Sequence, residues 1–247
     1  MKVQFINANQ AAGMIQDGSN VGLIGGGSGL VEATLLHEYI EKRFLETGTP
    51  KELTCIHALG IGDRETLGMN RFAHKGMVRR VIGGHWVWSP KMQQLARENS
   101  IEAYVLPGGV IMQLMREVAA KRPGLITHVG LGTFIDPLQE GGRMNEAAVD
   151  PLVERITIDG KDYLRYLPIP IDVALLKGSY ADEEGNISLD EEPANLDIYA
   201  MAAAAHNSGG KVIFQVRKKV AAGSIPARSV RIPSAIVDAV VVDPEQR

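Results

Sequence analysis

The sequence lacks several features that define whole classes of protein. Its 247 residues include a single cysteine, Cys55, so no disulfide framework can form within one chain. Acidic residues outnumber basic ones by 29 to 26, and the net charge of −3 indicates no basic surface for nucleic acid. No apolar run approaches the length of a membrane span, and no signal-peptide core follows Lys2. We therefore expect a cytoplasmic protein that binds neither nucleic acid nor membrane.

The composition is that of an ordinary globular protein. Hydrophobic residues make up 45% and charged residues 22% of the chain, which is long enough for one large domain with a real core. No interior linker, repeat or low-complexity tract divides it, so we expect one domain over residues 1–247. Cys55 lies in an apolar strand pattern, which predicts a buried and inert thiol.

Glycine is abundant, and its placement is informative. In the stretch 21–29, four apolar or small residues precede four glycines in five positions, and a helical pattern follows. This order predicts a buried strand, a tight turn and a helix start, with Ser28 as the N-cap. Glu32 would then lie in the first helical turn, where the helix dipole lowers the pKa of a carboxylate and suits a structural role. In open α/β sheets, ligands bind at this end of a strand.

Three glycine motifs fit this stretch incompletely. A dinucleotide fingerprint needs a third glycine where Glu32 stands, and no acidic residue ends the next strand to hold a ribose. A phosphate-binding loop needs a Gly-Lys-Ser/Thr sequence that is absent, and a nucleophile elbow needs a closing glycine where Leu30 stands. The alternative interpretation is that these glycines only allow the strand and the helix to pack closely.

Most of the chain alternates strand and helix. Because successive strand–helix units build parallel sheets with right-handed crossovers, the pattern predicts a mostly parallel α/β sheet. A period-two pattern around Asp159-Gly160 adds a β-hairpin near 154–167. The helices predicted by the pattern are 8–16, 28–47, 70–77, 90–99, 110–120 and 196–206, and the strands outside the hairpin are 21–24, 53–58, 78–82, 101–106, 125–129, 171–176, 187–189, 212–216 and 235–242.

Several segments, spread in order along the whole chain, resemble the family I coenzyme A transferases. The similarity is to the N-terminal, α half of single-chain acetate or short-chain acyl-CoA (propionate) CoA-transferases. The Gly-Thr-Phe-x-Asp-Pro element at 132–137 is the most specific of them. The segments are 25–33, 60–64, 84–86, 130–137 with 141–142, 182–186, 229–233 and 237–244.

The resemblance implies an open, mostly parallel sheet with helices on both faces. It also implies a reaction in which CoA moves from a short-chain acyl-CoA to a carboxylate such as acetate, through a glutamyl-CoA intermediate. The nucleophilic glutamate of the family lies in its second, β half, so we expect no catalytic residue here and no transfer without that half. CoA is then a substrate, no cofactor is implied, and a β-type half or subunit is the implied partner in an oligomer.

The candidate substrate-binding groups are backbone amides and small polar residues that could meet a carboxylate or thioester oxygen. We expect the glycines among them to line one cleft, with the Gly130–Pro137 loop as the best site. Where many relatives carry a glutamine this chain has Gly108, so Gly108→Gln is expected to preserve or raise transfer. The candidates are Gly26, Gly27, Ser28, Gly108, Gly109, Gly130, Gly132 and Thr133.

Other side chains favour plainer interpretations. His85, Trp86 and Trp88 could wall a pocket, although aromatic residues after a strand more often belong to a core or an interface. The remaining histidines show no metal-ligand spacing, so no metal site is expected. Two alternative functions stay open, namely a sugar-phosphate isomerase-like enzyme on a similar fold and a non-catalytic ligand-binding or scaffold domain.

Overall fold

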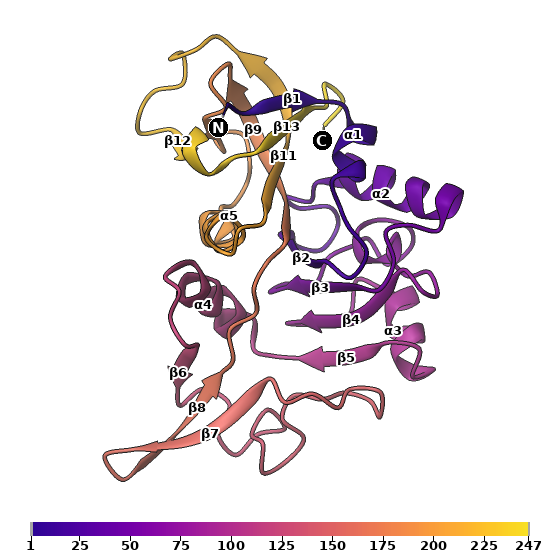
Figure 1. Ribbon diagram of the computed structural model, residues 1–247, viewed down its shortest axis with the longest axis vertical. Coiled ribbons are helices and arrows are strands. Elements are labelled where there is room, and N and C mark those ends of the chain that lie inside the picture. The colour runs from indigo at the N-terminus through magenta and orange to yellow at the C-terminus, as the bar shows by residue number, and fades with distance from the viewer. Residues whose placement is uncertain (1, 247) are drawn as a thin grey trace.

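The large sheet of the protein is open and mostly parallel. A computed structural model describes residues 2–246. Ten strands form this sheet, and eight of them follow the order β1-β13-β11-β9-β2-β3-β4-β5 (Figure 1). Every pair along that order is parallel, whereas β10 is antiparallel to β9 and β12. The strands are β1 (Gln4–Ile6), β2 (Asn20–Leu23), β3 (Leu53–His57), β4 (Val78–Gly83), β5 (Glu102–Val105), β9 (Val173–Asp182), β10 (Ile187–Ser188), β11 (Lys211–Val220), β12 (Val230–Ile232) and β13 (Ala239–Val242).

A second, small sheet has the order β6-β8-β7, with β6 (Leu125–Thr127), β7 (Val153–Ile158) and β8 (Lys161–Tyr166). The predicted hairpin is β7 and β8, which pair antiparallel across Asp159 and Gly160. The prediction that β6 continues the parallel sheet is wrong, because β6 pairs antiparallel with β8. Turns and bends, with no helix, follow β6 up to β7, so no crossover returns the chain to the large sheet.

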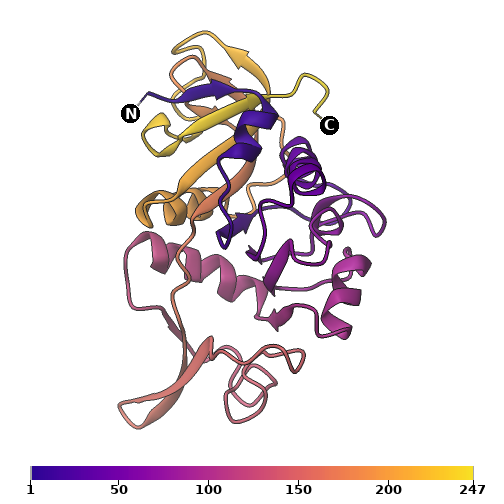
Figure 2. The same ribbon diagram turned by 45° about the vertical axis from the view of Figure 1, so that its right-hand side comes forward.

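Helices cover both faces of the large sheet, as predicted. Helices α4 and α5 pack against each other on one face, and α1, α2 and α3 lie on the other (Figures 1 and 2). The helices are α1 (Ala8–Gly13), α2 (Thr34–Thr47), α3 (Pro90–Arg97), α4 (Gly108–Ala119) and α5 (Ile198–Asn207), with single 3₁₀ turns at η1 (Gly68–Asn70) and η2 (Ser234–Ile236). The helix predicted at 70–77 is wrong, because only η1 and irregular turns occupy that region.

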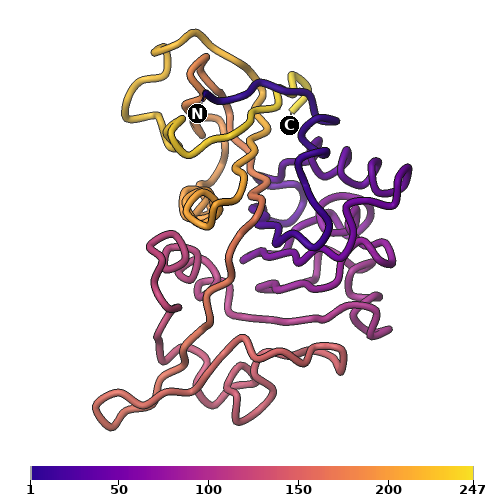
Figure 3. The backbone as a smooth tube through the Cα atoms, in the orientation of Figure 1, coloured from indigo at the N-terminus to yellow at the C-terminus, as the bar shows by residue number. Residues whose placement is uncertain are grey.

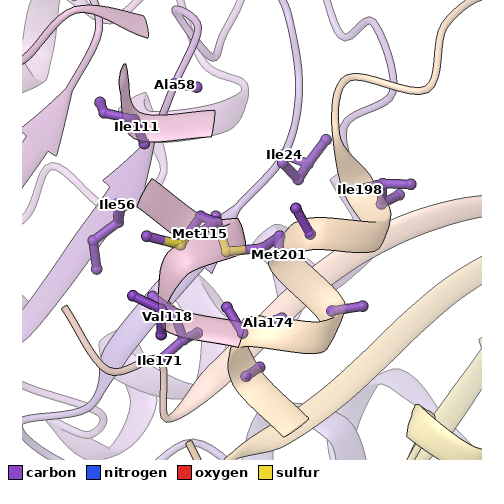
Figure 4. Packing of buried hydrophobic residues seen from close by; sticks show 14 of the residues in the cluster. Ile24, Ile56, Ala58, Ile111, Met115, Val118, Ile171, Ala174, Ile198 and Met201 are labelled. Carbon is purple, nitrogen blue, oxygen red and sulfur yellow. The ribbon is translucent and has the colours of Figure 1, made fainter. Parts of the chain in front are cut away.

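Each face has its own hydrophobic core. Beneath α4 and α5, Met115 and Met201 face each other between the two helices (Figure 4). Gly22 allows Met201 to lie against β2, since a Cβ at Gly22 would be 2.3 Å from the Met201 sulfur. The core under α2 contains Leu36, Ile40 and the buried Cys55, whose pKa burial raises to about 12. The predicted buried, inert thiol is confirmed.

Helix α2 begins six residues later than the pattern predicts, at Thr34 instead of Ser28. The N-cap position of α2 is Ala33, so the predicted cap at Ser28 is wrong. The Gln215 side chain of β11 performs the capping instead, because its Oε1 accepts the N–H of Leu35 at 3.0 Å. The other end follows the sequence, since Gly48 closes α2 in the left-handed conformation with its N–H donated to the Phe44 carbonyl.

The strand order contains one topological switch point. From β2 the chain builds outward through β3, β4 and β5, whereas β9, β11 and β13 fill the other side, so β2 and β9 are neighbours with connections running in opposite directions. Ligands of open α/β sheets bind at the carboxyl ends of such strands. The first and last strands of the described chain, β1 and β13, pair with each other at one side of the sheet (Figure 3). Within the described residues, no helix is long and apolar enough to cross a bilayer.

Candidate functional site

The loop after β2 lies against the loop after β3 at the carboxyl edge of the sheet. Gly27 forms a parallel bridge with Gly62, and the Ser28 N–H donates to the Gly62 carbonyl at 2.7 Å. Gly26 donates its N–H to the Leu30 carbonyl at 2.8 Å. The N–H groups of Gly26 and Ser28, both predicted to meet substrate, are therefore already bonded within the protein.

The same loop stores backbone strain. Ser28 and Val31 have φ of +65° and +55°, and Arg64 in the facing loop has φ of +74°. A left-handed conformation is a genuine outlier for a β-branched residue such as Val31. Strain of about 1–3 kcal/mol per residue persists only where surrounding contacts impose it, which is common at ligand sites.

Glu32 supplies one of those contacts. Its side chain is fully buried, and Oε1 accepts the Gly62 N–H at 2.8 Å. Among residues 2–246, Oε2 has no hydrogen-bond partner. Burial raises the Glu32 pKa to about 7, with Asp63 adding to the rise and Lys177 opposing it. The predicted lowered pKa is wrong, because Glu32 precedes α2 and is enclosed between the two loops.

Trp88 covers both loops. A Cβ at Gly27 would lie 2.0 Å from the Trp88 ring, and one at Gly60 would lie 2.7 Å from it. The Arg64 guanidinium stands over the indole, 4.6 Å from the ring centroid. These glycines therefore make room for an aromatic wall, a relation that connects residues far apart in the sequence and that the motif analysis did not find.

A second group of glycines packs around the Ala58 carbonyl. A Cβ at Gly84 would be 1.8 Å from that oxygen, and a Cβ at Gly108 would be 2.6 Å from it. Gly108 and Gly109 form the first turn of α4, two residues earlier than predicted. Within the described chain their N–H groups donate to no protein acceptor, as expected for the first positions of a helix. The N–H groups of Gly27 and Gly130 likewise donate to no acceptor in the described chain, but only Gly108 and Gly109 are neighbours in one helix start.

The Gly130–Pro137 loop packs near the end of β5, since the Val105 N–H donates to the Gly142 carbonyl and the Gly142 N–H donates to the Phe134 carbonyl. It follows β6 of the small sheet, and a Cβ at Gly130 would be 2.6 Å from the Tyr166 hydroxyl. The Gly132 N–H donates to Asp136, and both the N–H and the hydroxyl of Thr133 donate to the Gly130 carbonyl. The loop uses the Gly132 and Thr133 donors to hold its own turn, and the expectation of one cleft for all the glycines stays a prediction.

Asp136 organises that loop from inside. It is 1% exposed, and its carboxylate accepts the N–H groups of Gly132 and Leu138 and a guanidinium N–H of Arg155 at 2.8 Å. These bonds outweigh burial and lower the Asp136 pKa. Asp136 therefore holds the turn of this loop from its buried side.

A hollow of about 770 Å³ with many charged side chains, here called the switch-point cleft, lies between the β2 loop, the middle of β9 and β11, and residues 191–193 and 243–246. Lys177 and Glu192 form a buried ion pair in it, 3.2 Å apart and 6% and 5% exposed. Sequence reasoning missed both residues. The one available signal was a lysine directly after the apolar run 173–176, where a buried strand continues.

A second hollow of about 620 Å³, here called the edge pocket, lies between α3, β5 and residues 144–146. Its wall is largely apolar, and Gly84 is one of its lining residues. The Met144 N–H donates to the Ala103 carbonyl, which fixes the 144–146 segment along the edge strand. His85 and Trp86 line this pocket, and Trp86 also packs against the core under α2, as the interpretation that favoured a core position expects. Further side chains that line the edge pocket are Val87, Gln93, Ala96, Arg97, Val105 and Met144.

Other ionisable residues take structural positions. His37 and His57 are buried, and burial lowers their pKa values to about 3 and about 4. In the part of the chain that the structure describes, no group of three His, Cys, Asp or Glu residues has a geometry that could hold a metal.

Comparisons with known proteins agree with this architecture. A family model described as Coenzyme A transferase matches residues 5–243. Caffeate CoA-transferase of Acetobacterium woodii is 44% identical over 240 residues, covering 97% of this chain and 45% of that protein. Acetate CoA-transferase YdiF of Escherichia coli O157:H7 is 39% identical over 245 residues, covering 99% of this chain and 46% of that protein. The chain spans about half the length of these curated relatives.

Two further similarities concern the fold and the subunit organisation. The crystal structure of the YdiF thioester complex with CoA matches with a TM-score of 0.98, covering 100% of this chain and 48% of that one. The acetate CoA-transferase subunit alpha of Escherichia coli K12 is 25% identical over 248 residues and is matched along 100% of both chains. Full-length counterparts of this chain thus exist both as half of a longer protein and as a separate subunit.

Proposed function

Because this chain belongs to the coenzyme A transferase family, we propose that it is the α-type half of an enzyme that moves CoA from an acyl-CoA to a free carboxylate. The observation that carries the proposal is the open pair of N–H groups at Gly108 and Gly109, on the carboxyl edge of the sheet. Backbone donors at a helix start suit a carboxylate or a developing oxyanion. The names of the relatives, caffeate and acetate CoA-transferases, support the same reaction class.

The proposed reaction needs a nucleophile from a second half. A glutamate there attacks the thioester carbon, which releases CoA as the thiolate and leaves an acyl-glutamyl anhydride. The CoA thiolate then attacks the glutamyl carbonyl, which releases the first carboxylate and leaves a glutamyl-CoA thioester. Attack by the acceptor carboxylate reverses these steps with a new acyl group. The covalent intermediate divides one difficult exchange into easier steps.

In this scheme CoA is a substrate, and the enzyme uses no resident cofactor. The Gly108–Gly109 end of α4 orients the oxygen of the carboxylate or thioester. The Glu32–Gly62 contact and the Trp88 wall keep the adjoining loops in the conformation that borders the site.

Of the alternatives, an isomerase would need a free carboxylate base and lysine near the glycine loop. The structure does place Lys177 and Glu192 in the switch-point cleft, but they are ion-paired with each other and nearly inaccessible. CoA transfer is therefore the favoured function, and the experiment must distinguish it from a non-catalytic binding domain.

The test incubates the pure chain with an acyl-CoA and acetate, before and after a separately produced β half is added. We expect no transfer by the chain alone and transfer after addition, with CoA trapped on a glutamate of the β half. Trapped CoA on a glutamate of residues 1–247 would overturn the assignment of roles. No transfer with any β-type partner would favour the non-catalytic alternative.

A further inference from the structure

The connection between β6 and β7, residues 128–152, contains neither a helix nor a strand (Figure 1). An irregular segment of that length is uncommon in a compact domain and usually has a function. Its backbone is fixed from inside, because the buried Asp136 holds one turn and the Asn145 side chain donates to the Ala96 and Ile101 carbonyls at 2.9 and 2.8 Å. These bonds give the connection a defined conformation.

The same connection exposes a group of large apolar side chains. We define the loop face as Phe134, Leu138, Met144 and Val149, whose exposed fractions lie between 44% and 73%. Phe134, Met144 and Val149 line one surface hollow of about 750 Å³, and Leu138 directly precedes Gln139, which lines it too. Exposed apolar side chains that are scattered singly need no explanation, whereas a group around one hollow marks an interaction site.

The loop face borders the strand end from which α4 begins. The Val105 N–H at the end of β5 donates to the Gly142 carbonyl at 2.9 Å, and the Gly142 N–H donates to the Phe134 carbonyl at 3.0 Å. Gly108 and Gly109 follow Val105 within four positions and open α4. The loop face and the pair of open N–H groups therefore flank the same end of β5.

We propose that the loop face is a docking surface for the second, β-type half of the enzyme. The inference rests on the proposed function and adds a contact surface to it. In the proposed reaction the second half brings its glutamate to a carbonyl group held at Gly108 and Gly109, so that half must rest on the surface around the end of β5. This chain covers 45% of caffeate CoA-transferase and 46% of YdiF, so more than half of each relative remains to cover such a surface.

The chemistry of the loop face suits a protein partner. Charged Glu140, Arg143 and Glu146 line the same hollow as the apolar side chains, which gives the apolar centre and polar rim of a protein interface. Apolar anchors that fill such a hollow carry much of the binding energy of an interface. Because the connection is already fixed by its own hydrogen bonds, little conformational entropy is lost when a partner covers it.

The experiment places a charge on the loop face and measures association with a second half. Leu138→Asp and Val149→Asp change side chains that are 73% and 66% exposed, so both variants are expected to fold. The matched controls are Leu45→Asp on α2 and Tyr199→Asp on α5, which put the same charge on apolar side chains that are 62% and 55% exposed elsewhere. Melting temperatures check that all four variants are folded.

The binding partner is the part of Acetobacterium woodii caffeate CoA-transferase that this chain does not match, produced as a separate chain. The corresponding part of YdiF serves as a second probe. Calorimetry gives the Kd of each probe for the 247-residue chain and its variants, and sedimentation velocity follows self-association of the chain by itself.

We expect the parent chain to bind a probe and each loop-face variant to raise the Kd about tenfold or more, because a carboxylate would be buried among apolar groups of the interface. The controls should bind as the parent does. Equal Kd values for loop-face variants and controls, or no binding of either probe to the parent, would overturn the proposal. It would also be overturned if Leu138→Asp abolished self-association of the chain and left probe binding unchanged, since a second copy would then occupy the loop face.

A transfer measurement on the mixed halves separates docking from chemistry. The loop-face variants should lose transfer when the second half is scarce and regain the parent kcat when it is in excess, because the loop face contributes to association only. Transfer that stays low at saturating second half would contradict this assignment. Binding that depends on the loop face without any transfer by the parent would instead count against the proposed function and leave the docking surface standing.

Discussion

The carboxyl group of Glu32 accepts the backbone N–H of Gly62 at 2.8 Å and thereby ties the loop after β2 to the loop after β3. Thirty positions separate the two residues in the sequence. The bond lies beside the left-handed Ser28 and Val31, so it helps to hold a backbone that would otherwise relax.

Glu32→Gln should keep this hydrogen bond and remove the ionisation. The folded-state pKa of Glu32 is raised from 4.5 to about 7, so the folded protein holds the proton more tightly than the unfolded chain. That contribution is fully present below pH 4.5 and is lost as pH rises through 7. The stability of Glu32→Gln relative to the parent should therefore increase between pH 5 and 8 by on the order of 2 kcal/mol.

Urea unfolding at several pH values measures this difference. Glu65→Gln is the matched control, because Glu65 is an exposed carboxylate in the facing loop. Parallel stability curves for Glu32→Gln and the parent would show that the ionisation of Glu32 is not coupled to folding.

His37→Leu should stabilise the protein. Both ring nitrogens of His37 are buried without a partner among the described residues, and the ring meets Phe72 edge-on at 5.4 Å between centroids. Removing an unsatisfied buried donor is worth about 1–2 kcal/mol at pH 7. Since burial lowers the His37 pKa to about 3, the parent loses stability as pH falls below 6.5, and this part of the acid sensitivity should disappear. Thermal unfolding at pH 5 and 7 tests both effects, with His206→Leu on the exposed end of α5 as control.

Gly108→Gln should damage the protein, which reverses the expectation drawn from the family resemblance. A Cβ at Gly108 would be 2.6 Å from the Ala58 carbonyl oxygen, whereas a Cβ at Gly109 would meet nothing within 4 Å. Forcing a side chain against backbone costs about 1–3 kcal/mol. Melting temperatures should therefore fall for Gly108→Gln and hold for Gly109→Gln, and the latter is the position from which an added amide could be tested in CoA transfer. Equal melting temperatures would mean that the Ala58 loop moves aside.

Gly27→Ala should displace the Trp88 ring. A Cβ at Gly27 would overlap that ring at 2.0 Å, while Gly13 in α1 has nothing within 4 Å of its Cβ position and gives a control substitution. In a Trp86→Phe background Trp88 is the only fluorophore of its kind, since the chain has two tryptophans. We expect a red-shifted emission for Gly27→Ala and none for Gly13→Ala. An unshifted spectrum would show that Trp88 does not rest on the loop.

The parts of the fold that follow from short-range pattern were predictable. The alternation of apolar strands with amphipathic helices, the glycines after the strands, the Asp159-Gly160 hairpin turn and the Gly48 helix end all appear as the sequence indicates. These features depend on periodicity and on backbone conformations that few residues can adopt, and both are visible in neighbouring letters.

The site depended on contacts between segments that are distant in the sequence. Gln215 moves the start of α2 to Thr34 by capping it from a strand 180 positions away. The Gly130 loop follows the small sheet because β6 pairs with β8, and the Gly132 and Thr133 donors are bonded to residues of the same loop. Neither the capping by Gln215 nor the pairing of β6 with β8 can be recognised from neighbouring residues in the sequence.

The protonation of Glu32 and the accessibility of the glycine N–H groups also depended on contacts between distant segments. Glu32 has a raised pKa because two loops enclose it, although a carboxylate after glycines at a helix start would be expected to have a lowered one. The sequence alone was sufficient to predict the family, the mostly parallel sheet and the glycines that follow its strands. Which of those glycines hold a tryptophan, which surround a carbonyl and which leave an N–H open was decided only when the strands were brought side by side, because close packing and desolvation are properties of neighbours in space.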